Sequence, residues 1–351
     1  MGVQFVMRIT FLLLLTYGLA EAAPPPLAMP GCKDTCGNVS IPYPFGMTAG
    51  CYLNDWFKIN CSTGNGSSAG NDSSVRAFLP SINMEVLEIK IPNPFNDDSY
   101  PYSSFEPGIV RVNMPNIISS NCTSTGAING GVSMTGGPFY FSSYRNKFIS
   151  VGCNNIALMT GSDPTVLVGC NSDCDNETII KREAKCWGFN CCQTTVPYGN
   201  QVFNATFKSK NEKNKGIEKC KYAFLAEEGW FDSNITNPSY QVPHLKYVPV
   251  ALEWIVPNLT RMSSTETDWF YNNYNATYYL CLRGYEGNPY LNTGCQDINE
   301  CEKDNNECSD KSDCENTEGS YNCDRRKARW KIVIIDQDRP GIIIHDLILP
   351  F

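Results

Sequence analysis

"GCQDINECEKDNNECSDKSDCENTEGSYNC" occupies residues 294–323 and indicates what kind of fold the chain uses. Cys301, Cys308, Cys314 and Cys323 follow one another closely, and the residues between them are mostly polar. An even number of closely spaced cysteines is typical of a disulfide framework. It predicts a small module closed by disulfides.

The other cysteines are consistent with the same chemistry. The chain has 18 cysteines, in groups of twelve (Cys32 to Cys220), two (Cys281 and Cys295) and four (Cys301 to Cys323), so each group can close on itself. A metal cluster is the alternative, since two Cys-x-x-x-Cys pairs are spaced like half-sites. With only two histidines in 351 residues, disulfides are favoured.

The N-terminus predicts export into an oxidising compartment. Arg8 precedes the apolar run "ITFLLLLTYGLA", and small residues follow at Ala20 and Ala22. This is the order of a signal peptide, with cleavage after Ala22. A membrane anchor is the alternative, but the run of about 12 residues falls short of the roughly 20 that a spanning helix needs.

Potential glycosylation sites support secretion. The chain has ten Asn-x-Ser/Thr sequons, none beyond residue 275, and glycans there would place their loops on the surface. The acceptor residues are Asn38, Asn60, Asn65, Asn71, Asn121, Asn176, Asn204, Asn234, Asn258 and Asn275.

Charge excludes one class of partner. The formal net charge is −8, and the basic cluster "RRKARWK" lies near the C-terminus, so the remaining chain is more acidic still. A nucleic-acid-binding protein needs a basic face, so we expect no nucleic-acid partner. The apolar runs after that cluster are short and interrupted by charges, so we expect no membrane span.

Strand patterns dominate the body. In "LEIKI", Leu87, Ile89 and Ile91 alternate with charged residues, and "VRVNM" (110–114) alternates in the same way. One stretch, Ile217 to Ala226, has apolar residues at helical spacing and predicts a short helix. The fold class predicted is all-β, built from small disulfide-rich domains.

The opening segment resembles the calcium-binding EGF-like module. Calcium prefers six to eight oxygen ligands from carboxylates, amides and backbone carbonyls, and carboxylates stand just before Cys301. Carried over by position, the resemblance implies calcium as the cofactor, with Tyr321 packing the joint between modules. It implies side-chain ligands at Asp297, Glu300 and Asn316, and backbone ligands at Ile298, Thr317 and Ser320.

The same resemblance implies disulfide pairs. Its pattern pairs Cys301 with Cys314 and Cys308 with Cys323, but its fifth and sixth cysteines are absent after Asp324. Upstream, "CLRGYEGNPYLNTGC" is similar to the end of another EGF-like unit, with a final Cys281–Cys295 bridge. We therefore expect a degenerate EGF-like unit followed by a truncated calcium-binding one.

Further blocks resemble the galacturonan-binding ectodomain of plant wall-associated receptor kinases. They are "CKDTCGNVSIPYPFGMTAGC", "GPFYFSSYRNKFISVGC", "CWGFNCCQTTVPYGNQVFNATF" and "KYAFLAEEGWF", followed by the EGF-like segments, over about residues 28–324. The resemblance implies a β-rich extracellular module of the plant cell wall that binds pectin or oligogalacturonides. A protein ligand, for a soluble truncated receptor or decoy, is the alternative.

Candidate sugar contacts follow from the chemistry of pectin. De-esterified galacturonan is a polyanion, which arginine or lysine can bind while an aromatic ring packs on the sugar. Tyr144, Arg145 and Lys147 in "SSYRNKF" are the candidates, although they can equally be solvated strand residues. Tyr43 and Phe45 of "IPYPFG" are expected to be packing residues.

No catalytic motif is found. The chain has no Gly-rich phosphate loop, no His-Arg-Asp loop and no Asp-Phe-Gly, so we expect no kinase activity. A secreted hydrolase is the rival class, since paired carboxylates cannot be recognised from sequence. However, no serine lies in a Gly-x-Ser-x-Gly elbow, and His244 is the only histidine before the tail.

These patterns divide the chain into six segments. We expect a signal peptide (1–22), a Pro-rich lead (23–30), a galacturonan-binding-type region (31–225), a linker with the degenerate EGF-like unit (226–295), a truncated calcium-binding EGF-like module (296–324) and an aberrant or unstructured tail (325–351).

Overall fold

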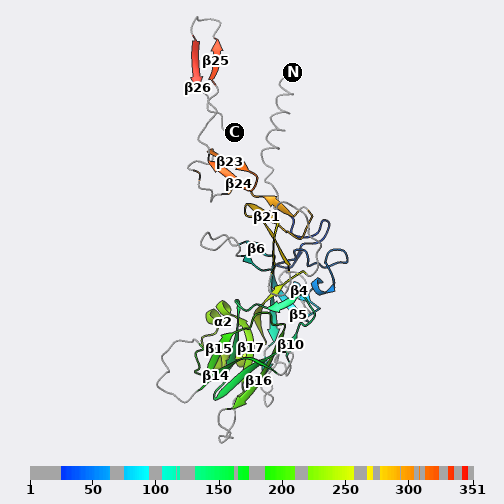
Figure 1. Cartoon of the computed structure of the whole chain (residues 1–351), viewed down its shortest axis with the longest axis vertical. Coiled ribbons are helices and arrows are strands. Elements are labelled where there is room, and N and C mark those ends of the chain that lie inside the picture. Colours follow the sequence, from blue (N-terminus) through cyan, green and yellow to red (C-terminus); the bar gives the residue numbers. More distant parts are fainter. Residues whose placement is uncertain are drawn as a thin grey trace.

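The computed structural model describes residues 25–346 with gaps. The gaps are 64–74, 95–104, 116, 119–130, 162–164, 174–185, 210–219, 257–266, 272–276, 293, 304–307, 309–312, 324–330 and 336–341. The signal peptide and six of the sequons (Asn65, Asn71, Asn121, Asn176, Asn258 and Asn275) lie outside the described residues. Figure 1 shows the body at one end of the long axis, with β21 and then β23 and β24 toward the other end.

Antiparallel strands form the body, in agreement with the predicted all-β class. The largest sheet has six strands. In order across the sheet they are β11 (Phe139–Phe141), β18 (Tyr247–Trp254), β8 (Ile109–Pro115), β5 (Met84–Lys90), β4 (Val75–Leu79) and β3 (Asn60–Thr63).

Two four-stranded sheets complete the body. One contains β10 (Val132–Ser133), β16 (Val202–Ser209), β13 (Asn155–Thr160) and β14 (Val166–Ser172). The other contains β15 (Cys191–Thr195), β12 (Asn146–Val151), β17 (Tyr222–Glu227) and β9 (Ile117–Ile118).

Short elements connect and extend these sheets. The helical segments are η1 (Asp55–Phe57), α2 (Glu228–Asn234), α3 (Pro238–Gln241) and η4 (Val242–His244). The two-stranded pairs are β1 (Thr35–Cys36) with β2 (Val39–Ser40), β6 (Asn93–Pro94) with β7 (Phe105–Glu106), β19 (Thr267–Tyr271) with β20 (Thr277–Cys281), β21 (Tyr285–Gly287) with β22 (Cys295–Asp297), and β23 (Cys314–Thr317) with β24 (Ser320–Cys323).

The predicted strand alternation is confirmed in β8 and shifted in β5. Val110, Val112 and Met114 are all buried, as the period-two pattern predicts. In β5 the register shifts between Val86 and Glu88. Such a bulge changes which residues face the core, so Leu87 is only partly buried although the alternation predicted that it points with Ile89.

The helix predicted over Ile217–Ala226 is wrong in its described part. Tyr222–Glu227 is strand β17, which pairs with β12 on one side and β9 on the other. Its first five residues are all buried. A strand buried on both faces is continuously apolar, so its hydrophobic period cannot distinguish it from a buried helix.

The domain boundary that we expected at residue 225 falls within the body, because strands of the body lie on both sides of it in the sequence. We expected residues 226–295 to be a linker with a degenerate EGF-like unit. Instead, Tyr247–Trp254 is a nearly completely buried strand between β11 and β8. A boundary drawn from cysteine spacing missed this strand because it contains no cysteine.

The tail, which we expected to be aberrant or unstructured, contains two strands. Lys331–Ile335 (β25) and Ile342–Asp346 (β26) form an antiparallel pair. Both runs are rich in isoleucine, a β-branched residue that favours strands. Pro340 and Gly341 stand between the two runs in the sequence, in the part that the structure does not describe.

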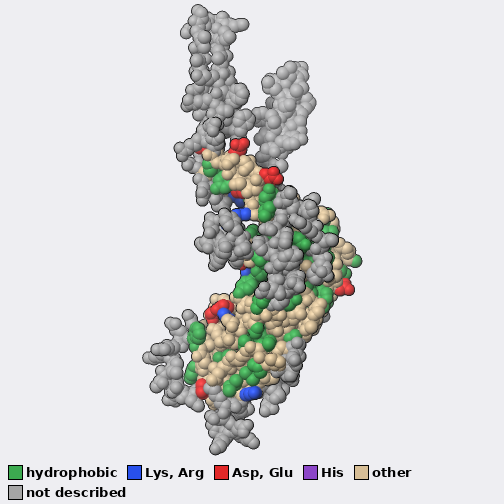
Figure 2. Space-filling view, in the orientation of Figure 1, with side chains coloured by type: hydrophobic (Ala, Val, Ile, Leu, Met, Phe, Trp, Pro, Cys, Tyr) green, Lys and Arg blue, Asp and Glu red, His purple; other side chains and the backbone are tan. Residues whose placement is uncertain are grey.

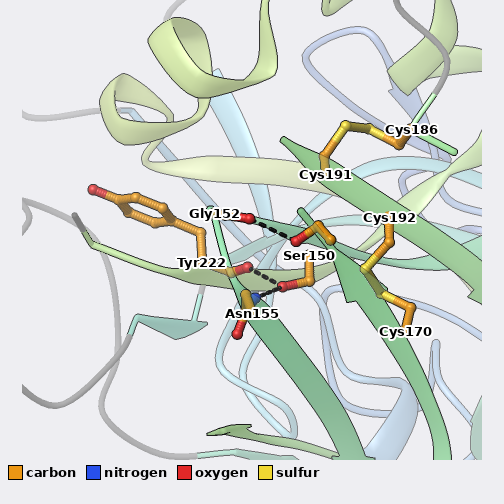
Figure 3. Close-up of a disulfide and its surroundings, with 9 residues drawn as sticks. Ser150, Gly152, Asn155, Cys170, Cys186, Cys191, Cys192 and Tyr222 are labelled. Carbon is orange, nitrogen blue, oxygen red and sulfur yellow. Dashed lines mark hydrogen bonds between the residues drawn. A yellow bond between two sulfur atoms is a disulfide. The ribbon is translucent and has the colours of Figure 1, made fainter. Parts of the chain in front are cut away.

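Disulfides fasten the edges of the body. Cys32 is bonded to Cys51 and Cys36 to Cys61. Figure 3 shows the neighbouring residues 191 and 192 bonded to different partners, in the pairs Cys186–Cys191 and Cys170–Cys192. Buried hydrogen bonds surround them, including one from the Ser150 hydroxyl to the Tyr222 carbonyl at 2.9 Å.

Trp254 at the end of β18 lies at the centre of the core. Its ring meets Phe45 at 5.6 Å and Phe57 at 6.2 Å between centroids, and Tyr290 of the EGF-like unit at 5.3 Å. The indole N–H donates to the Lys90 carbonyl at 3.1 Å. The body, its N-terminal disulfide-linked part and the EGF-like unit therefore share one aromatic core. Phe45 is 1% exposed, which confirms its packing role.

Asn288 joins the EGF-like unit to the N-terminal segment. Its side-chain amide is fully buried and donates to the backbone carbonyls of Leu27 and Tyr43, both at 2.6 Å. Its own carbonyl oxygen accepts from the Tyr290 N–H at 3.0 Å. The "GNPY" turn is thus part of the body's core and not an independent module.

We expect Gly108→Ala to destabilise the fold by about 1–3 kcal/mol, because a Cβ there would lie 2.3–2.7 Å from the Trp254 ring. Denaturant unfolding of the disulfide-intact chain measures the change. Gly229→Ala is the matched control, since its Cβ would meet no atom within 4 Å. Equal stability of the two variants would contradict the tight packing of Trp254.

Candidate functional site

The turn from Ser142 to Asn146 carries two of the predicted sugar contacts, Tyr144 and Arg145. Asn146 fixes this turn from inside: its fully buried amide donates to the Ser142 and Ala251 carbonyls and accepts from the Ala251 N–H. The turn is therefore held rigidly against β18, and the side chains that it presents have defined positions.

Arg145 is paired with residues of the chain itself. Its guanidinium donates to the Glu106 carboxylate at 3.0 Å and lies 5.8 Å from the centre of the Tyr144 ring. Burial by itself would lower the pKa of Arg145, but hydrogen bonding to Tyr144 and the charges of Glu106 and Glu227 raise it. Arg145 therefore keeps its positive charge, and the carboxylate of Glu106 compensates it.

Neighbouring cations are compensated in the same way. Lys147 Nζ lies 3.4 Å from the Glu228 carboxylate. Arg111, on the outer side of β8, makes a bidentate contact with Glu227 at 2.7–3.0 Å and a longer one of 3.3 Å with Glu88. This side of the body offers little free positive charge to a polyanion.

A pocket of about 420 Å³ opens beside this turn. It is lined by Tyr144, Arg145, Glu227, Glu228, Gly229 and Trp230, so the start of α2 forms its other wall. The Glu228 N–H donates to the Arg145 carbonyl at 3.0 Å and ties the two walls together. Figure 2 shows charged side chains of both signs gathered over α2.

Two groups beside the pocket have raised pKa values. Burial, with the charge of Glu253, raises the pKa of Tyr144 to about 12, although Arg145 and Ser142 act in the opposite direction. The pKa of Glu253 is also raised by burial, against the stabilising contacts of Ser142 and Arg145. Tyr144 therefore remains a protonated hydrogen-bond donor at any ordinary pH.

The N-terminal disulfide-linked part carries a second set of cations. The Cys32–Cys51 disulfide lies beside Gly46, and Gly46 forms an isolated β-bridge with Lys58. Exposed Lys33 and half-buried Lys58 are therefore held in loops that one disulfide connects. Arg76 on β4 is 66% exposed in its side chain, with a long 3.5 Å contact to Glu85. An ion pair this exposed stabilises little, so Arg76 can exchange its partner.

In the EGF-like end the structure brings two predicted calcium ligands together. Asn316 Nδ2 donates to Asp297 Oδ2 at 2.7 Å, and the Gly319 N–H donates to the other oxygen of Asp297. Rotation of the Asn316 amide by half a turn would exchange its N–H₂ for its oxygen, so that an amide oxygen and a carboxylate oxygen could both be directed at one cation. Amide and carboxylate oxygens are the donors that calcium prefers, so these two residues fit the ion.

The other expected ligands lie on the same or adjoining elements. Thr317 and Ser320 pair at the end of the β23–β24 hairpin, where the Thr317 hydroxyl donates to the Ser320 carbonyl at 2.9 Å. Ile298 follows Asp297 directly in the chain. Glu300 is half-buried, and its backbone carbonyl accepts a hydrogen bond from the Lys303 N–H. Within the described residues no group of three His, Cys, Asp or Glu could hold a metal, so the ligand set expected here combines two carboxylates with amide and carbonyl oxygens.

Disulfides hold this end together in the pairs Cys301–Cys314, Cys308–Cys323 and Cys281–Cys295.

The joint between the two EGF-like units involves Tyr285, which was not predicted from the sequence. Gly319 packs so closely against Tyr285 that an added Cβ would lie 3.0 Å from its ring. Tyr321 is half-buried and lies opposite Asn316 in the β23–β24 hairpin. The Ile298 N–H also bonds to the Gly284 carbonyl at 2.9 Å.

Most of the residues that line the pocket were not predicted from the sequence. Glu227, Glu228 and Trp230 lie in the "AEEGW" segment, whose charged and aromatic residues follow a buried strand, and this change of character is the only signal that marks them. Of the described sequon asparagines, Asn38, Asn60 and Asn234 are exposed and Asn204 is partly buried.

Comparison with known families assigns three regions. The family described as "Wall-associated receptor kinase galacturonan-binding" matches residues 32–96, "Wall-associated kinase" matches 183–264, and "Calcium-binding EGF domain" matches 297–333. Tyr144, Arg145 and Lys147 lie outside the galacturonan-binding match. No solved structure matches the chain.

Curated relatives from Arabidopsis thaliana extend the likeness to most of the chain. "Wall-associated receptor kinase-like 3" is 34% identical over 89% of this chain and 44% of its own length. "Wall-associated receptor kinase-like 6" is 33% identical, over 84% and 48%. The chain thus spans less than half the length of these relatives. None of the helices in the described residues is both long and apolar enough to cross a membrane.

We expect Glu253→Gln to stabilise the chain more at about pH 7 than at about pH 4. Burial raises the pKa of Glu253 in the folded state above its value in the unfolded chain. The unfolded chain therefore loses this proton first as the pH rises from about 4 to about 7, which lowers the free energy of unfolding of the parent. Glutamine stays neutral and can still accept a hydrogen bond from Ser142. Denaturant midpoints at both pH values measure the effect, with exposed Glu315→Gln as control. A gain that does not change with pH would contradict this explanation.

Proposed function

The chain belongs to the family of wall-associated receptor kinases, whose extracellular part it matches, and from that premise we propose that it is a non-catalytic cell-wall protein that binds de-esterified pectin. The observation that carries the proposal is the galacturonan-binding match over residues 32–96. The proposed location is the cell wall outside the plasma membrane, reached by secretion.

The structure supports a binding role for the matched segment. Two disulfides and the contacts of Phe45 and Phe57 with Trp254 hold it rigidly on the body. A rigid site loses little conformational entropy when it binds an extended polymer, which favours affinity. The segment also carries cations that a polyanion needs: Lys33 and Arg76 are exposed and Lys58 is half-buried.

We place the galacturonan contact on Lys33, Lys58 and Arg76. The carboxylates of de-esterified galacturonan can form charge-assisted hydrogen bonds with these side chains. Arg145 and Lys147 remain the rival set, but they already lie against Glu106 and Glu228. A polyanion would have to displace those carboxylates and approach their negative charge.

We also propose that the EGF-like end binds calcium through Asp297, Glu300 and Asn316, with the backbone carbonyls of Ile298, Thr317 and Ser320. Bound calcium would supply a positive charge that stiffens the junction with the preceding unit. The match to calcium-binding EGF domains and the contact between Asp297 and Asn316 support this assignment.

Affinity electrophoresis of the full oxidised chain in galacturonan gels tests pectin binding. We expect de-esterified polymer, but not fully methylated polymer, to retard the chain, and added salt to weaken the retardation. Combined Lys33→Ala, Lys58→Ala and Arg76→Ala should abolish it, whereas combined Arg145→Ala and Lys147→Ala should leave most of it.

Two further measurements separate the alternatives. New reducing ends in the gel polymer would indicate a secreted hydrolase and overturn the non-catalytic role. Loss of retardation in a chelator would assign the contact to bridging calcium. Retardation under none of these conditions would sink the pectin proposal and favour a protein ligand, as for a soluble receptor form or decoy.

For calcium, titration calorimetry on the full chain should show one weak site, with a dissociation constant of about 10⁻⁴–10⁻³ M, as in extracellular modules. Asn316→Ala and Glu300→Ala should each abolish it because each removes a side-chain ligand. Glu315→Ala is the matched control, since Glu315 is exposed and neighbours Asn316 on the same strand. Unchanged heats in the two ligand variants would refute the assignment.

A further inference from the structure

We propose that the pocket between the Ser142–Asn146 turn and the start of α2 binds an uncharged, hydroxyl-rich sugar unit of a neutral wall glycan. This pocket lies outside the segment matched to galacturonan binding, and its lining includes neither Lys33, Lys58 nor Arg76. The inference does not depend on the pectin proposal.

Size sets the first limit on the ligand. The pocket volume of about 420 Å³ falls in the range of small-molecule sites, about 300–1,000 Å³. It suits one or two sugar rings, not a folded protein surface. Its walls come from a turn fixed by Asn146 and from α2, so the pocket is formed before a ligand arrives.

Charge compensation sets the second limit. Of the charged residues lining the pocket, Glu227 is bound bidentately by Arg111, Glu228 faces Lys147, and Arg145 donates to Glu106. A polyanion would meet two carboxylates on the wall, and a basic peptide would meet Arg145. A neutral ligand leaves every pair intact.

The pocket provides both kinds of hydrogen-bonding partner that sugar hydroxyls need. The Glu228 side chain is half exposed and can accept from a hydroxyl. Arg145 Nε is buried and has no hydrogen-bond acceptor among the described residues. A buried donor left in this state costs stability, and a ligand hydroxyl could satisfy it once a small movement of the Arg145 side chain opens Nε to the pocket.

Aromatic rings supply the apolar part of the contact. Tyr144 is 50% exposed and Trp230 is partly buried, and both line the pocket. The faces of such rings can pack against the C–H faces of a sugar. Because its pKa is raised to about 12, Tyr144 keeps its hydroxyl proton and can donate it to a further sugar oxygen.

Gly229 allows the pocket to be closed without disturbing the fold. A Cβ at this position would meet no atom within 4 Å, and its backbone is helical, so a larger side chain is tolerated. Leucine is also a better helix former than glycine. Gly229→Leu should therefore fill the pocket and leave the thermal midpoint equal to or above that of the parent.

Saturation-transfer NMR on the enzymatically deglycosylated full chain tests the proposal. The probes are cellotetraose, xylotetraose and mannotetraose, with tetragalacturonate and tetralysine as charged counterparts. We expect transfer to at least one neutral probe and an affinity at least about tenfold lower in Gly229→Leu and Tyr144→Ala. Trp187→Ala, which removes a 79% exposed tryptophan outside the pocket, should bind like the parent.

Three outcomes overturn the inference. These are no transfer to any neutral probe, neutral binding that Gly229→Leu leaves unchanged, and binding of tetragalacturonate or tetralysine that Gly229→Leu removes. The last outcome would assign the pocket to a charged ligand. Gel retardation by galacturonan in Gly229→Leu tests the pectin proposal separately, since its cations lie elsewhere.

Discussion

The packing around Trp254 is the constraint on which the rest of the structure depends. Its ring contacts Phe45 and Phe57 from the N-terminal segment and Tyr290 from the EGF-like unit, three regions far apart in sequence. Close approach of Gly108 leaves no room for a side chain on one side of the ring. Disulfides close loops locally, but this aromatic core makes the separate loops one body.

Internal ion pairs decide which surfaces can bind an acidic polymer. Arg111 joins Glu88 on β5 to Glu227 at the end of β17, and thereby links two sheets across the outside of the body. Arg145 and Lys147 are paired with acidic residues of neighbouring elements. Cations that hold sheets together are poorly available to ligands, so the more exposed cations of the N-terminal segment become the better candidates. Since the net charge is −8, such exposed cations are valuable to a polyanion-binding protein.

Sequence reasoning reached the fold class because its signals are local. Alternation over Val110, Val112 and Met114 identified a strand directly, and cysteine density identified the small cross-linked modules. It failed where burial on both faces removes the alternation, as in β17, and where a strand without cysteines returns to the main sheet, as in β18. In the tail, the isoleucine runs favour the β25–β26 pairing even though charged residues interrupt them.

The sequence by itself determined the all-β class, the family likeness and the residues expected to face calcium, because spacing along a chain is enough to specify local loops. Only the tertiary structure decided which cations are available. Arg145 and Lys147 look free in "SSYRNKF", yet their partners Glu106 and Glu228 lie far away in sequence. The pocket likewise combines a turn near residue 144 with a helix that starts at Glu228. No local pattern encodes such a meeting, because it arises from the pairing of β12 with β17.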